Sequence, residues 1–116
     1  MKKWIIYTII LGIILILSSG SIYYYSQIQK RTLSNQNQVI EKAKNIYNQS
    51  LQKGMNFSSQ CLGTIYVQEI GYAVDIVHIP RISEDNLPQN QCQDYLKDKV
   101  SHFVELDYKG NIIRIL

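Results

Sequence analysis

WIIYTIILGIILILSSGSIYYY, residues 4–25, holds no charged side chain and has an almost unbroken aliphatic centre. At about 1.5 Å per residue, a helix of this length spans about 33 Å, enough for a bilayer hydrocarbon core of about 30 Å. The stretch therefore predicts that residues 1–25 form an N-terminal membrane anchor, with the lipid bilayer as the first partner of the chain.

Aromatic residues mark both ends of this apolar stretch. Trp4 and Tyr7 lie near one end, and Tyr23, Tyr24 and Tyr25 lie at the other. Amphipathic rings prefer the two membrane–water interfaces, so we expect these five side chains to sit there.

The same N-terminus also fits a secretory signal that is removed from the mature protein. Lys2 and Lys3 supply a basic start, residues 4–17 an apolar segment, and Ser18-Ser19-Gly20 a small-residue region that permits cleavage after Gly20. Apolar character resumes at residues 22–25, which favours a retained anchor, and the secreted form stays as the alternative.

Orientation in the membrane is not decided by charge, because Lys2 and Lys3 on one flank oppose Lys30 and Arg31 on the other. An even number of cysteines in a small domain suits an oxidising compartment. The cysteines therefore place the C-terminal part outside the cytoplasm.

The charge of the remaining chain is nearly balanced. Lys2 and Lys3 account for two of the 12 basic residues, against 9 acidic ones, so residues 26–116 carry a net charge of +1. A net charge this small does not indicate a nucleic-acid-binding protein. Within residues 26–116, the segment 26–53 is basic. This suits either contact with anionic lipid headgroups or a solvated helix face.

Residues 26–54 predict an amphipathic helix. There is no Pro or Gly before Gly54, a natural left-handed stop, and the apolar positions follow one helical face: Val39, Ile40, Ala43, Ile46, Tyr47 and Leu51. Whether residues 4–53 form one continuous helix stays open at this stage.

Alternating apolar residues predict strands in the rest of the chain. We expect strands at 62–69 and 72–79 joined by a turn at Ile70-Gly71, and strands at 100–107 and 111–116 joined by Tyr108-Lys109-Gly110. Between them, residues 81–91 are expected to be a loop, and Pro88 suits the first turn of a short helix. Cys92, Tyr95 and Leu96 then share a helical face that packs against the sheet.

These elements predict an α+β fold: a transmembrane helix, then an amphipathic helix packed on an antiparallel sheet of about four strands. Residues 55–116 form a small β-rich region that makes one domain with the helix.

Cys61 and Cys92 are expected to form a disulfide across about 30 residues, worth about 3 to 4 kcal/mol in the chain-entropy model. Reduced structural thiols and a metal site with His78 and His102 are the alternatives. The four side chains are scattered singly, with no paired-ligand spacing, so we expect no metal and no other cofactor.

No Ser or Cys stands in a nucleophile motif, so a non-catalytic protein is expected. A membrane-bound enzyme would need His78 or His102 beside a carboxylate. A possible recognition loop lies within residues 79–88 and carries Arg81, Glu84, Asp85 and Asn86, with a plain connection as the simpler reading. The expected function is protein–protein contact by an anchored accessory or assembly module, and a secreted inhibitor or effector is the alternative. The sequence specifies neither the partner nor the oligomeric state.

Overall fold

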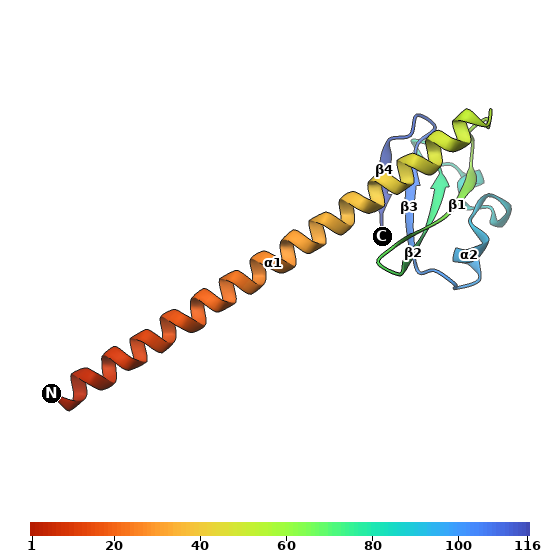
Figure 1. Ribbon diagram of the computed structural model, residues 1–116. Coiled ribbons are helices and arrows are strands. Elements are labelled where there is room, and N and C mark those ends of the chain that lie inside the picture. Colours follow the sequence, from red (N-terminus) through yellow and green to blue (C-terminus); the bar gives the residue numbers. More distant parts are fainter. The chain divides into compact units, whose positions relative to one another are not determined.

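The computed structural model describes residues 1–116 and has an α+β fold, as predicted (Figure 1). The chain divides into two compact units, Met1–Ser34 and Asn35–Leu116. The elements in chain order are α1 (Lys2–Gln52), β1 (Gln60–Val67), β2 (Ile70–Ile76), the 3₁₀ turns η1 (Ser83–Asn86) and η2 (Pro88–Asn90), α2 (Gln93–Leu96), β3 (His102–Leu106) and β4 (Ile112–Ile115).

The unit Met1–Ser34 is helical from Lys2 onward. Its helix is long and apolar enough to cross a bilayer, and none of the apolar window is buried by the rest of the chain. The helix is continuous through residues 25 and 26, where the sequence divides an anchor from an amphipathic segment. No breaker occurs between them, because the stretch contains no Pro and its glycines are flanked by helix-compatible residues.

Helix α1 ends at Gln52 in a Schellman motif. The Met55 N–H donates to the Ser50 carbonyl at 3.1 Å, the Gly54 N–H donates to the Leu51 carbonyl at 3.0 Å, and Gly54 has a φ of 75°. The predicted stop at Gly54 is therefore confirmed.

The last turns of α1 form the core of the unit Asn35–Leu116 together with one face of the sheet. Val39, Ala43 and Tyr47 are buried against apolar side chains of the strands. Leu51, expected on the same face, is 53% exposed, and Ser50 is buried in its place. The buried stripe thus steps by three residues after Tyr47, where the helix reaches the end of the sheet.

The sheet is mixed, and the prediction of an all-antiparallel sheet was wrong. Its order is β1-β2-β3-β4, with β1–β2 and β3–β4 antiparallel and β2–β3 parallel. The reason is the connection through residues 77–101, which is long enough to carry the chain back along the sheet before β3 begins. Alternation within a strand contains no information about the direction of its neighbour.

The first hairpin turns two residues earlier than predicted. Gln68 and Glu69 form the turn with φ values of 48° and 69°, and Val67 pairs with Ile70. Gly71 lies inside β2 instead, where an added Cβ would overlap Cγ1 of Val100. This glycine is explained by close packing rather than by a turn.

The second hairpin lies where the sequence predicted it, with strands one or two residues shorter at their ends. Gly110 has a φ of 82°, as expected for its place in the turn. Tyr47 of α1 packs against this turn and donates its hydroxyl hydrogen to the Tyr108 carbonyl at 3.0 Å, which fixes the hairpin to the helix.

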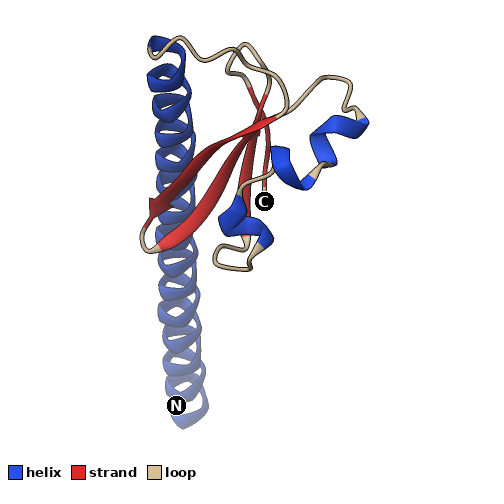
Figure 2. Cartoon of the chain, turned by 90° about the vertical axis from the view of Figure 1, so that its right-hand side faces the viewer, coloured by secondary structure: helices blue, strands red, loops and turns tan.

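The segment between β2 and β3 covers the face of the sheet opposite α1, as Figure 2 shows. Pro88 begins η2 as predicted. Cys92 and Tyr95 pack with Ala73, Val100 and Phe103 in a second small core. Leu96, expected to pack there too, is 39% exposed because α2 is a single turn and Leu96 lies at its end.

Candidate functional site

The face of the sheet opposite α1 carries the charged side chains that the fold brings together. Along β2 and β3, Val74, Ile76, Val104 and Leu106 belong to the core under α1. Because side chains alternate along a strand, Asp75 and Glu105 point to the opposite face, and the parallel register places them side by side. We call this surface, with Asp75, Arg81, Tyr95, Phe103, Glu105 and Arg114, the polar face.

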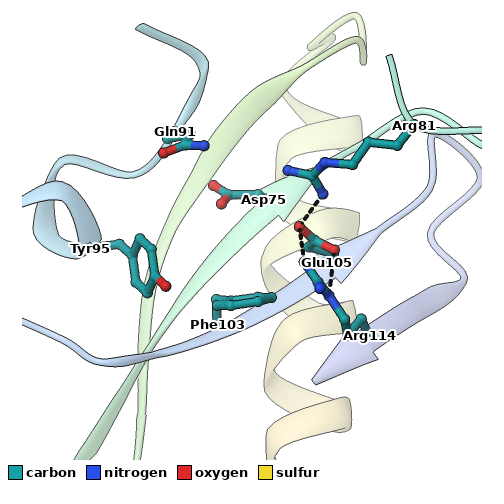
Figure 3. Close-up of a pocket in the computed structure, with 7 residues that line it drawn as sticks. All are labelled: Asp75, Arg81, Gln91, Tyr95, Phe103, Glu105 and Arg114. Atoms are coloured by element: carbon teal, nitrogen blue, oxygen red, sulfur yellow. Dashed lines mark hydrogen bonds and ion pairs between the residues drawn. The ribbon is translucent and has the colours of Figure 1, made fainter. Parts of the chain in front are cut away.

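Glu105 is the buried anion of the polar face. Arg114 of β4 donates from Nε to Oε2 at 3.0 Å and from Nη2 to Oε1 at 3.1 Å, and Arg81 donates to Oε1 from the other side (Figure 3). The Arg114 guanidinium also lies 4.7 Å from the centre of the Phe103 ring. Both arginines keep part of their side chains exposed, 37% for Arg81 and 49% for Arg114.

These side chains line a cleft of about 170 Å³, which Gln91 and Tyr95 complete (Figure 3). Asp75 lines the cleft as well. Burial raises the pKa of Asp75, the charge of Glu105 raises it further, and the Cys92 backbone N–H and Arg81 only partly offset them, which leaves a pKa of about 7. Asp75 is therefore a carboxyl group that holds its proton into the neutral range.

The predicted disulfide between Cys61 and Cys92 is present and joins β1 to the start of α2. Cys92 is 1% exposed, and its Sγ lies 3.0 Å from Oδ1 of Asp75. Cys61 is partly exposed and lines an open surface cavity next to the cleft. Gln91 lines both.

Asp75, Cys61 and Cys92 form the one group of potential metal-ligating residues in the chain. A cysteine binds metal as a thiolate, and in the disulfide neither sulfur carries that charge. His78 and His102, the other candidates from the sequence, lie elsewhere: His78 contacts Asp85, and the His102 ring is 5.1 Å from that of Tyr72.

His78 lies in a second polar cluster with Ser59 and Asp85. Its Nδ1 is 2.9 Å from Asp85 Oδ1 and 3.2 Å from Ser59 Oγ, while the Ser59 hydroxyl donates to Asp85. A nucleophilic triad needs the serine and the carboxylate on different ring nitrogens, but here both meet Nδ1. Ser59 is also buried, so the cluster has the geometry of a structural tie rather than of an enzyme site.

Asp85 is the centre of that tie. Burial raises its pKa, but hydrogen bonds from Ser59, from the Ile82 N–H and from His78 outweigh the burial and lower the pKa to about 2. The carboxylate holds η1 to the end of β2.

The four side chains predicted as a recognition loop are thus divided between separate surroundings. Arg81 belongs to the cleft, and Asp85 is buried and internal. Asn86 accepts two hydrogen bonds from Arg81, at 3.1 and 3.0 Å, and orients it. Glu84 is exposed.

The five aromatic side chains predicted at the membrane interfaces all lie on α1 and are exposed: Trp4 80%, Tyr7 68%, Tyr23 69%, Tyr24 65% and Tyr25 69%. The apolar residues between them are exposed as well.

Sequence reasoning missed Asp75, Glu105 and Arg114. The available signal was one carboxylate inside each of two otherwise apolar strands, which calls for a polar partner wherever it is buried. Comparison of the chain with models of protein families, with curated proteins and with solved structures finds no match.

Proposed function

We propose that this chain is a single-pass membrane protein that presents its unit Asn35–Leu116 outside the cytoplasm as a non-catalytic interaction module. Its partner is another protein, and the polar face of the sheet is the contact surface. The proposal covers anchor, orientation and contact surface, each of which has its own support.

The observation that carries the anchor is that no residue in the apolar window of α1 is buried by the rest of the chain. A run of exposed Ile and Leu on this scale is unfavourable in water, at about 25 cal/mol for each Å² of apolar surface. Lipid covers it without any further chain. The aromatic residues at both ends of the window fit the two interfaces.

The orientation is supported by the disulfide, because such bonds persist in oxidising compartments and are rare in the cytosol.

The contact surface is supported by the composition of the polar face. Partly exposed arginine and tyrosine side chains are enriched among residues that dominate binding energy at interfaces. The cleft of about 170 Å³ is smaller than the 300 to 1,000 Å³ typical of small-molecule sites, which favours a single side chain of a protein partner. The unpaired hydrogens of Arg114 Nη1 suit a carboxylate from that partner.

Two measurements test the proposal in the native host. Alkaline carbonate extraction should leave the full-length chain in the membrane fraction, and protease added from outside the cytoplasm should degrade residues 35–116. Soluble protein that lacks residues 1–20 would support the secreted alternative and contradict the anchor.

Site-specific photocrosslinking tests the surface. A photoreactive phenylalanine analogue at position 95, in the cleft, should crosslink a partner, and the same analogue at Tyr66, an exposed tyrosine of β1, is the matched control. Arg114→Gln should abolish the crosslink at position 95. Equal crosslinking from both positions, or a crosslink that survives Arg114→Gln, would refute this surface.

A further inference from the structure

The two sulfurs of the disulfide differ in access. Both cysteines border the same open surface cavity, but Cys61 is partly exposed, whereas Cys92, directly before α2, is only 1% exposed. Disulfide exchange begins when a thiolate attacks one sulfur in line with the bond. An external thiolate therefore has access to Cys61 Sγ, and Cys92 Sγ becomes the leaving group.

The leaving sulfur is next to a carboxyl group. Asp75 Oδ1 lies 3.0 Å from Cys92 Sγ, and a disulfide sulfur has no hydrogen to donate. This contact is a hydrogen bond only when Asp75 is protonated and donates. No other side chain donates a hydrogen bond to Asp75.

The surroundings of Asp75 keep that proton in place. The negative charge of Glu105 of β3 disfavours ionisation of Asp75, while the positive charge of Arg81 favours it. Arg114 is hydrogen-bonded to Glu105 instead. Tyr95 of α2 lines the same cleft. The resulting pKa of about 7 agrees with a group that is protonated in a large fraction of molecules at neutral pH.

We propose that Cys61–Cys92 is an exchangeable redox centre that oxidises a dithiol on a partner protein, with Asp75 as the proton donor to the Cys92 sulfur. This activity goes beyond the proposed non-catalytic interaction module, is a single stoichiometric exchange for each oxidised molecule and does not depend on the membrane anchor.

The exchange balances in two steps. A partner thiolate attacks Cys61 Sγ, the Cys61–Cys92 bond breaks, and its electron pair goes to Cys92 Sγ, which takes the proton of Asp75. The second partner thiolate then attacks the partner sulfur of the mixed disulfide, and Cys61 leaves as a thiolate that is protonated by water. The partner dithiol is oxidised to a disulfide, and Cys61 and Cys92 are reduced to thiols.

The test uses the full chain in a mild detergent with dithiothreitol as the dithiol. Samples are quenched by alkylation and counted by intact mass, and each rate is divided by the concentration of dithiothreitol thiolate. In the wild type the normalised rate should fall as the pH rises through about 7, since Asp75 loses its proton there. A normalised rate that is flat across this range would overturn the proposal.

Substitution provides the second arm. Asp75→Asn keeps the shape but supplies no acidic proton, so the normalised rate at pH 6.5 should fall by about tenfold or more. Glu84→Gln is the matched control, because Glu84 is exposed and lines neither the cleft nor the cavity beside Cys61, and its rate should equal that of the wild type. An unchanged or faster rate in Asp75→Asn would also overturn the proposal.

Reduction through unfolding gives a distinct result. Direct exchange is first order in dithiothreitol and insensitive to urea well below the unfolding midpoint. A rate that saturates with dithiothreitol and rises with low urea would mean that the disulfide reacts only in opened molecules, which contradicts the proposal.

Discussion

Replacing Asp85 with Asn should destabilise the folded unit and reduce its sensitivity to acid. Asp85 is 4% exposed and accepts hydrogen bonds from the Ser59 hydroxyl, from the Ile82 N–H at 2.9 Å and from both the backbone and the ring of His78. An amide at this position must turn an NH₂ group toward donors and leaves some of them unpaired.

The pKa gives the magnitude. Burial alone raises the pKa of Asp85, but these hydrogen bonds lower it from 3.8 to about 2. At 1.36 kcal/mol per pKa unit, the ionised carboxylate contributes about 2.5 kcal/mol of stability. Because the folded pKa lies below the unfolded one, this contribution is fully present above about pH 4 and is lost as the pH falls through 2.

The assay is urea denaturation of the intact chain in a mild detergent, followed by near-ultraviolet circular dichroism of the tyrosines, from pH 7 to pH 2. Asp85→Asn should lose about 2 to 3 kcal/mol at pH 7, and its stability should fall less steeply than that of the wild type between pH 4 and pH 2. Glu84→Gln, at the exposed carboxyl one residue away, is the control and should change stability by less than about 0.5 kcal/mol. The reasoning is refuted if Asp85→Asn keeps both the wild-type stability and the wild-type acid profile.

Three further predictions follow from the packing and the charges. Gly71→Ala should cost about 1 to 3 kcal/mol because the new Cβ would overlap Val100 Cγ1, and adding Val100→Ala should recover part of this loss. Equal urea midpoints for Gly71→Ala and the wild type would contradict this prediction. Replacing Cys61 and Cys92 with Ser should lower the unfolding free energy by about 3 to 4 kcal/mol, since the disulfide closes a separation of 31 residues; a loss below about 1 kcal/mol would sink that estimate. Asp75→Asn should raise stability at pH 8, by on the order of 4 kcal/mol, because the folded pKa of about 7 lies above the unfolded value of 3.8. The ionised form costs stability as the pH rises through about 7. A variant less stable than the wild type at pH 8 would contradict the raised pKa.

Local features of the chain were predictable from the sequence. The apolar stretch from Trp4 to Tyr25, the stop at Gly54 and the turn at Gly110 each depend on a short segment whose own chemistry decides its structure. The disulfide was predictable as well, because only two cysteines are present and a small domain gains most from joining them.

Apart from the disulfide, contacts between distant segments were not predictable. The parallel pairing of β2 with β3 depends on the path of residues 77–101, and neither strand encodes it. The turn at Gln68-Glu69 was missed because Gly71 suggested a turn at its own position. In the structure, Gly71 is required because the Val100 side chain, 29 residues later, leaves no room for a Cβ.

The polar face could not be predicted from the sequence for the same reason. Asp75 meets Glu105 only through the parallel register, and it meets Cys92 only because the crossover folds back over the sheet. From sequence alone, Asp75 is one polar residue in an apolar strand, with no indication of its neighbours.

The intact mass of the protein from membrane and soluble fractions of its native host, with thiol alkylation before and after reduction, tests the central claim most directly. An anchored, oxidised, extracytoplasmic module predicts a full-length mass confined to membranes, with two alkyl groups added only after reduction. A soluble protein whose mass begins at Ser21, or a membrane protein whose two thiols alkylate without reductant, would contradict it.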